Sequence, residues 1–322
     1  MNPYPLLFEP SLHVKVWGGN AMQTRLGKHT ASDEPVGESW EIYSGNTIAN
    51  GECAGITLRE LLTQFPAEIL GRHRQDDFPL LVKFLDAQDW LSVQVHPDDA
   101  LALELEGEPR GKTECWYILS ADANAEIIYG CSRELTTEEF RTALTGGTAR
   151  DVLQYVRVQA GDFIYVPAGT VHAIGPGILL YELQQTSDTT YRLYDWDRAG
   201  LDGKPRPLHI EKSVRCAHLD VRPTAQVKYT TDTYTPGISV ATLVRGQYFG
   251  LDVLMLSIPL RLTTEQDTPH LLTVASGSVE IHGAGFDPVT LPLGTSALIP
   301  AGVGEYEIIP TADATILCAF IS

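Results

Sequence analysis

Three polar side chains alternate with apolar ones along the segment LSVQVHPDD. Side chains of a β-strand point to opposite faces in turn, so Ser92, Gln94 and His96 would share one face and the apolar residues of 91–95 the other. An amide beside an imidazole is unlike the lysines, glutamates and threonines of an ordinary solvent-facing row, and both groups can bind divalent metal ions. The segment therefore predicts a strand that presents a metal and substrate site.

Two further residues extend the candidate metal-binding set. Glu114 lies in the next strand-like segment, TECWYIL, and His172 ends the segment GDFIYVPAGTVH. With Gln94 and His96 they offer imidazole nitrogens, a carboxylate and an amide oxygen, a mixed set suited to zinc or another first-row divalent metal. Since a lone histidine in a strand is usually an ordinary core or surface residue, the prediction depends on these four side chains converging.

The motif that ends at His172 recurs near the C-terminus. GDFIYVPAGTVH is matched by GTSALIPAGVGE, which ends at Glu305, and both have the spacing G-x5-P-x-G-x2 before the last residue. Glycine and proline fix turns and close backbone approach, so their repetition indicates two copies of one small β unit. We expect the second copy to bind no metal, because Glu305 replaces the histidine and no Gln-x-His strand precedes it.

The elements that must position these side chains are mostly short strands. Gly and Pro separate β-type runs over 78–96, 113–130, 160–185 and 234–322. Helical spacing over 57–73 predicts one helix, or two broken near Pro66, and a capping box at Thr136 predicts a helical insertion over 135–159. We expect that insertion to cover one open end of a barrel. The pattern is typical of a mainly β protein with helical additions.

Composition narrows the classes of function. The chain has 322 residues, 43% of them hydrophobic, which is enough for two globular domains. Its net charge of −18 leaves no basic face for nucleic acid or an anionic membrane. No basic leader or membrane-length apolar run is present, so we expect a cytoplasmic protein. The scattered cysteines lack a CxxC pair and predict buried, reduced thiols: Cys53, Cys115, Cys131, Cys216 and Cys318.

Several motifs together resemble a known family. The segment that ends at His172 resembles the second signature of the cupin superfamily, G-x5-P-x-G-x2-H-x3-N, with Pro176 in place of the asparagine. WLSVQVHPDD, GKTECWYIL, VPAGTVHAIG and YELQQTSDTTYRLYDWDR, with WGG at Trp17 and GESWEI at Gly37, resemble the type I mannose-6-phosphate isomerases in their short bacterial form. This resemblance covers the chain from near residue 14 to about residue 220. From residue 234 the chain resembles only the degenerate second cupin of that family.

The resemblance implies a fold and a division into domains. It implies a mainly β protein of two cupin-type, jelly-roll β-barrels. A catalytic metal-binding domain with helical insertions would cover residues 1–233, and a degenerate second domain without metal would cover residues 234–322.

The resemblance also implies roles for individual residues. In the family, the residues at these positions bind one zinc ion per chain: Gln94, His96, Glu114 and His172. Arg192, Lys112 and Glu182 would be catalytic, and Ser92, Lys83 and Asp188 would contact the substrate. Three of them have an alternative role. Glu182 could form an ion pair with a Lys or Arg, and Lys83 could extend its ammonium to the surface. Arg192 could pair with one of the acidic residues at 188, 195 and 197.

The activity implied is the interconversion of mannose 6-phosphate and fructose 6-phosphate through a cis-enediol. Such a reaction needs a base, a group that stabilises the enediolate oxygens and an anchor for the phosphate. Glu182, Lys112 and a metal-bound water are candidates for the base, and the sequence does not distinguish them. The alternative function is a non-catalytic or regulatory metal-binding cupin that binds a sugar phosphate, without nucleic acid or membrane partners.

Overall fold

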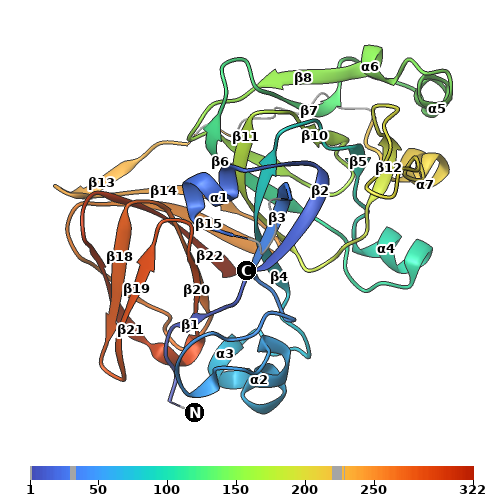
Figure 1. The fold of residues 1–322 in the computed structure, drawn as a ribbon. Coiled ribbons are helices and arrows are strands. Elements are labelled where there is room, and N and C mark those ends of the chain that lie inside the picture. Colours follow the sequence, from blue (N-terminus) through green and yellow to red (C-terminus); the bar gives the residue numbers. More distant parts are fainter. Residues whose placement is uncertain (1, 30–33, 220–226, 228) are drawn as a thin grey trace. The chain divides into compact units, whose positions relative to one another are not determined.

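The computed structural model describes residues 2–29, 34–219, 227 and 229–322 (Figure 1). Strands predominate over helices in this part of the chain, which confirms the mainly β class. Contacts divide the chain into two compact units. The central unit comprises residues 12–39 and 83–227, and the terminal unit comprises residues 1–11, 40–82 and 228–322. The predicted domains divide the chain once, after residue 233, whereas each observed unit combines separate segments.

The central unit contains two antiparallel sheets. The order of the six-stranded sheet is β2 (Ser11–Gly19), β3 (Val36–Ile42), β4 (Leu80–Ala87), β11 (Ile178–Gln185), β6 (Glu114–Ala121) and β9 (Phe163–Val166). The order of the five-stranded sheet is β12 (Tyr191–Tyr194), β5 (Val93–Val95), β10 (His172–Ile174), β7 (Glu126–Cys131) and β8 (Leu153–Arg157). The helices here are α1 (Ala21–Leu26), α4 (Asp99–Glu106), α5 (Thr137–Thr145), α6 (Ala149–Val152) and α7 (Ile210–Cys216).

The terminal unit also contains two antiparallel sheets. The order of its seven-stranded sheet is β1 (Leu6–Leu7), β20 (Ser296–Ile299), β17 (His270–Ser276), β22 (Ala314–Ile321), β15 (Phe249–Leu256), β14 (Ile238–Arg245) and β13 (Asp232–Thr235). The order of its four-stranded sheet is β16 (Leu260–Thr263), β21 (Glu305–Pro310), β18 (Ser278–Gly283) and β19 (Phe286–Pro292). Its helical elements are η1 (Gly51–Cys53), α2 (Leu58–Gln64), α3 (Pro66–Leu70) and η2 (Ala301–Val303).

The helices of residues 57–73 belong to the terminal unit, because they contact its C-terminal part. Thr57 and Glu60 form a capping box at the start of α2, and Pro66 opens α3, so the predicted break near Pro66 is confirmed. α3 contacts η2, and Arg72 forms an ion pair of 2.8 Å with Asp267. These contacts explain why residues 40–82 group with the end of the chain.

The interior of the central unit changes from apolar to polar along its strands. Trp17, Leu85 and Ile118 of the six-stranded sheet form one buried cluster with Ile127 and Ile174 of the five-stranded sheet. In register across β6 and β11, the interior pairs progress from Ile118 with Leu180, through Trp116 with Glu182, to Glu114 with Gln184. Polar side chains this deeply buried need hydrogen bonds or charged partners. One end of the interior is therefore core, and the other end is the candidate site.

The predicted helical insertion over 135–159 forms α5 and α6 but ends in the strand β8, and α5 covers a sheet face, not the predicted barrel end. Phe140 of α5 and Val214 of α7 share a buried cluster with Val93, Val95 and other residues of the five-stranded sheet. These strand residues point away from the interior face that carries Gln94 and His172. Since they are apolar, the outer face of this sheet must be covered, and α5 and α7 cover it.

Two further expectations concern the whole described chain. All five cysteines are buried and free, which confirms the predicted thiols. None of the helices in the described residues is both long and apolar enough to cross a membrane.

The first turn of the repeated motif is alike in both units, and the second turn differs. Gly161 and Gly294 both have a positive φ, of 88° and 76°, which favours glycine at the two positions. The backbone N–H groups that close the turns donate over closely similar distances: Asp162 to Gln159 (3.1 Å), Thr295 to Pro292 (3.1 Å), Thr170 to Pro167 (3.1 Å) and Val303 to Pro300 (3.0 Å). The second turn differs, because Gly169 has a φ of 84° whereas in the other copy the positive φ, of 72°, lies at Gly304 and not at Gly302. The two copies thus share the backbone structure of the first turn only.

Candidate active site

Three strands place predicted site residues on one face of the five-stranded sheet. Gln94 of β5 lies opposite His172 of β10 on one side and opposite Arg192 of β12 on the other. Facing residues of antiparallel strands project to the same face, so these side chains share the interior face. Leu91 differs from the prediction. It precedes the short strand β5 and packs in the interior cluster of Ile174, apart from the valines of β5.

His96, Glu114 and His172 converge at the polar end of the interior. Nε2 of His96 lies 3.5 Å from one oxygen of Glu114, and Nε2 of His172 lies 3.3 Å from the other. The three side chains are each 1% exposed. In the described part of the chain this is the one group of three His, Cys, Asp or Glu residues whose ligand atoms lie within 4.8 Å of one another. The side-chain amide of Gln94 is 3.2 Å from Nε2 of His172.

Backbone carbonyls orient both imidazoles. Nδ1 of His96 donates to the carbonyl oxygen of Thr189, and Nδ1 of His172 donates to that of Thr170, both at 2.9 Å. These bonds leave the Nε2 lone pairs directed at Glu114, the arrangement common to metal-binding histidines. Burial lowers the pKa of both histidines, to about 4 for His172, and nearby Lys112 lowers that of His96 further. Both rings are therefore neutral at pH 7 and able to donate a lone pair.

The environment of Glu114 fits a bound cation. Among the described residues, neither of its buried oxygens accepts a hydrogen bond of normal geometry, although the Lys112 ammonium lies 2.9 Å from Oε2. Two imidazole lone pairs directed at a carboxylate are unfavourable unless positive charge lies between them. Rotating the Gln94 amide by half a turn presents its oxygen to the same point. The set of two imidazoles, a carboxylate and an amide fits a divalent metal ion.

Lys112 is a buried cation beside this cluster. Its Nζ lies 3.3 Å from Nε2 of His96, in addition to its ion pair with Glu114. Burial by itself lowers the pKa of Lys112, but the carboxylates of Glu114 and Glu182 outweigh burial and raise it above the usual value. Lys112 is therefore an ammonium group at pH 7.

Lys83 lies between the buried carboxylate of Glu182 and the partly buried carboxylate of Glu38. Its Nζ is 3.5 Å from Glu182 and 3.7 Å from Glu38, and the residue is 4% exposed. The alternative of a surface-extended Lys83 is therefore wrong, and the alternative ion pair of Glu182 is observed. Burial raises the pKa of Glu182, Glu114 raises it further, and Lys112 and Lys83 partly oppose the rise.

Trp116 contacts both the carboxylate of Glu182 and the group of His96, Glu114 and His172. Its indole N–H donates to Glu182 at 3.0 Å, and its ring packs edge-on against His172 with centroids 5.4 Å apart. The hydroxyl of Ser92, also buried, lies 3.5 Å from the Gln94 amide. Asp188 is the predicted residue that stands apart, since it is exposed in the loop between β11 and β12.

Arg192 keeps its charge without a paired carboxylate among the described residues. Its Nη1 donates to the carbonyl oxygen of Pro207 at 2.9 Å, and its buried Nε has no hydrogen-bond partner there. Asp195, one of the alternative partners predicted, forms ion pairs with Arg206 and Arg198 at 2.5 and 3.2 Å. Arg192 is therefore available to bind an anion, whereas Lys83 and Lys112 are already paired with carboxylates.

The sequence did not single out Glu38 or Trp116 as site residues. Both lie in segments that carried the family resemblance, GESWEI and GKTECWYIL, but neither has a local spacing that indicates a role. Their functions depend on Lys83 and Glu182, which come from strands far along the chain. Only the order of strands in the six-stranded sheet brings these four residues together.

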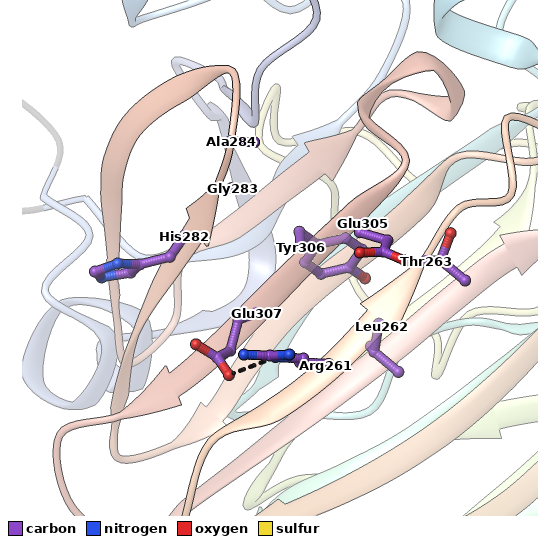
Figure 2. Close-up of a pocket in the computed structure, with 9 residues that line it drawn as sticks. All are labelled: Arg261, Leu262, Thr263, His282, Gly283, Ala284, Glu305, Tyr306 and Glu307. Atoms are coloured by element: carbon purple, nitrogen blue, oxygen red, sulfur yellow. Dashed lines mark hydrogen bonds and ion pairs between the residues drawn. The ribbon is translucent and has the colours of Figure 1, made fainter.

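The second copy of the motif places its residues differently. Tyr306 and Ile308 of β21 belong to the interior cluster of the terminal unit. Glu305 directly precedes Tyr306 in the same strand, so its side chain points to the opposite face. In β10 the corresponding phase is reversed, and His172 itself faces the interior. Figure 2 shows Glu305 and Glu307 beside a hollow of about 710 Å³, where Glu307 pairs with Arg261 at 3.2 Å.

Comparisons with known proteins show which family the chain belongs to. The sequence model described as "Phosphomannose isomerase type I, catalytic domain" matches residues 6–111. The chain is 40% identical to the mannose-6-phosphate isomerase of Streptococcus mutans over 94% of both chains, and 39% identical to mannose-6-phosphate isomerase ManA of Bacillus subtilis over 96% of both. A crystal structure of the mannose 6-phosphate isomerase from Bacillus subtilis superposes with a TM-score of 0.89 at 35% identity, covering 98% of this chain and 99% of that chain. The chain therefore belongs to the type I phosphomannose isomerase family of enzymes.

Proposed function

We propose that the protein interconverts mannose 6-phosphate and fructose 6-phosphate through a cis-enediol, with one zinc ion per chain. The observation that carries the proposal is the buried group of His96, Glu114 and His172, whose free lone pairs and carboxylate converge beside Lys112. The substrate is inferred from the names of the relatives. The proposal includes a cytoplasmic location.

Four side chains would hold the zinc ion: Gln94, His96, Glu114 and His172. Bound there, zinc would polarise the sugar carbonyl and stabilise negative charge on the enediol oxygens, a contribution of several kcal/mol. Lys112 would add a fixed positive charge on the same side, because its ammonium already lies next to His96 and Glu114.

Glu182 is the residue we propose as the base. The raised pKa of Lys112 keeps that residue protonated, so Lys112 cannot accept the proton from carbon. Glu182 has the opposite character: burial and Glu114 raise its pKa above the usual value of a glutamate, which makes it a stronger base once it is ionised. The indole N–H of Trp116 holds one of its oxygens and leaves the other near Lys83.

The phosphate and the developing oxyanion would be bound by the cations around this interior. Arg192 is our choice for direct contact, since its planar guanidinium suits phosphate and its Nε has no partner in the described residues. Lys83 and Ser92 would contribute further donors, and Asp188 would reach a sugar hydroxyl from its exposed loop.

Lys83→Met should shift the acid limb of the pH–rate profile to higher pH. Lys83 lowers the pKa of Glu182, so its removal raises that pKa further and keeps the base protonated over a wider range. Lys15→Met is the matched control, because Lys15 pairs with Glu38 at 3.0 Å from the more exposed side. An unmoved acid limb in Lys83→Met would exclude Glu182 as the group that titrates.

Metal analysis of the purified protein should give close to one zinc ion per chain. The second copy of the motif turns Glu305 away from the interior of its unit and pairs Glu307 with Arg261, so it offers no set of converging ligands. A value near two that fell to one in Glu305→Gln would contradict this assignment.

A coupled assay tests the proposed reaction. Purified protein should convert mannose 6-phosphate to fructose 6-phosphate, and in D2O some deuterium should appear on carbon in the product, as an enediol requires. Glucose 6-phosphate serves as the comparison substrate. Binding of mannose 6-phosphate without turnover would instead support the non-catalytic cupin.

A further inference from the structure

His209 holds both peptide groups of Arg192. Strand β12 is the edge of the five-stranded sheet, so its outward N–H and C=O groups face no further strand. The backbone N–H of Arg192 donates to Nδ1 of His209 at 3.1 Å, and the backbone N–H of His209 donates to the carbonyl oxygen of Arg192 at 2.7 Å. One residue thus supplies the acceptor and the donor that a neighbouring strand would supply.

This bonding determines how Arg192 faces Gln94. Because both peptide groups of Arg192 point outward to His209, its pairing with Gln94 in β5 is of the non-hydrogen-bonded kind. Facing side chains come closest in pairs of that kind. We call these two hydrogen bonds between His209 and the backbone of Arg192 the His209 clamp. The clamp fixes Arg192 in the register that brings its side chain closest to Gln94, a predicted zinc ligand.

The same segment holds the other end of Arg192. The carbonyl oxygen of Pro207, two residues before His209, accepts from Nη1 of Arg192 at 2.9 Å. Backbone and guanidinium are thus attached to one short stretch of chain, and the side chain has little freedom to leave the interior face.

His209 occupies a helix N-terminal position, where a side chain ordinarily caps its own helix. It is the N-cap residue of α7, and its carbonyl oxygen accepts the first helical bond, from Ser213 at 2.8 Å. N-cap side chains usually accept a hydrogen bond from the first turn of their own helix. The side chain of His209 makes no such bond, and its Nδ1 accepts from Arg192 instead.

The surroundings keep His209 in place and neutral. α7 lies beside β12 (Figure 1), and Lys212 of α7 pairs with Glu106 at 2.6 Å, while Tyr191 of β12 donates to the same carboxylate. Burial lowers the pKa of His209, and the positive charges of Arg192 and Lys212 lower it further against Glu106. A neutral ring is what an accepting Nδ1 requires.

We propose that His209 is a positioning residue for Arg192: it fixes the backbone of Arg192 so that the guanidinium meets the sugar phosphate. The inference depends on the proposed function only in giving Arg192 that task. The clamp itself is a feature of the chain and can be tested without turnover.

The test compares two substitutions of His209. Asparagine places an amide oxygen near the position of Nδ1 and is a good N-cap residue, whereas alanine removes the acceptor. We expect His209→Ala to lower kcat/KM about tenfold, the equivalent of one lost hydrogen bond, and His209→Asn to restore most of it. Zinc content should stay unchanged in both. Leu208→Ala, at an exposed neighbouring residue, is the control.

A double-mutant cycle separates positioning from general stability. If His209 acts through Arg192, adding His209→Ala to Arg192→Ala should lower kcat/KM no further, because the positioned group is already absent. A further tenfold loss in the double variant, or loss of zinc from His209→Ala, would overturn the proposal.

Amide hydrogen exchange gives a readout independent of catalysis. The Arg192 amide should exchange slowly in the wild type and in His209→Asn, and much faster in His209→Ala. If the protein proved inactive on mannose 6-phosphate, the proposed function would fail while this result still tested the clamp. Equal protection in all three proteins would show that His209 does not hold Arg192.

Discussion

Replacing His96 by alanine is expected to remove most of the bound zinc and to lower kcat for mannose 6-phosphate about a thousandfold, the equivalent of roughly 4 kcal/mol. His96 offers the lone pair of Nε2 to the cluster because its Nδ1 donates to the carbonyl oxygen of Thr189, and alanine has no lone pair to replace it. Without the His96 imidazole, Glu114 and His172 remain of this group of three metal-binding side chains. The positive charge nearest to Glu114 is then the Lys112 ammonium. Zinc content and initial rates measured on one preparation check both effects.

The matched control for this variant is His282→Ala. His282 is a histidine of the terminal unit that contacts Glu280 at 2.9 Å and takes no part in the cluster. It should keep full zinc content and activity. Wild-type zinc content and turnover in His96→Ala would mean that His96 does not bind the metal.

Glu182→Gln is expected to lower kcat by a factor of about 10² to 10⁴, the usual contribution of a general base, while zinc stays bound. The substitution keeps size and can still accept the Trp116 N–H, but it removes the group that takes the proton. In the wild type the base must be ionised, so activity rises with pH through the pKa of Glu182. Since that pKa is raised, the rise occurs at higher pH than for an exposed glutamate.

Glu305→Gln provides the internal control, because Glu305 ends the second copy of the motif. It should leave kcat and the pH profile unchanged. If Glu182→Gln retained the wild-type rate with the same acid limb, the base would have to be another group, and the buried pair of Glu182 with Lys83 would be structural.

The positions of Gln94, His96 and His172 were predictable because their signal is local. Alternation over 92–96 placed Gln94 and His96 on one face, and the Gly and Pro spacing before His172 fixed the turn that starts β10. Pairing of His172 with Gln94 then needs only neighbouring strands in one sheet. The capping box at Thr136 and the helical spacing over 57–73 similarly marked helices that the structure contains.

Other features had no local signal. The contacts of Lys83 with Glu38 and Glu182 join three strands that are distant in the sequence, so they follow from sheet order and not from spacing. Helix α4 was missed because DALALELE alternates apolar and polar residues as a strand does. Its start depends on Asp98, whose carboxylate accepts from the Leu101 N–H at 2.8 Å.

The two copies of the motif show how a repeat can mislead. The first turns agree, but the second turns differ in where the positive φ lies, at Gly169 in one copy and at Gly304 in the other. A shift of one residue in the phase of the following strand then exchanges its two faces. His172 consequently faces the interior of its unit, whereas in β21 that face carries Tyr306 and Ile308. Sequence spacing alone could not reveal this difference.

The most direct test of the account follows zinc content and turnover together in one sample. A chelator should remove close to one zinc ion per chain and abolish conversion of mannose 6-phosphate to fructose 6-phosphate. Added zinc should restore both in proportion in the wild type, and neither in His172→Ala. Full activity in metal-free protein would contradict the central claim that His96, Glu114 and His172 form a catalytic zinc site.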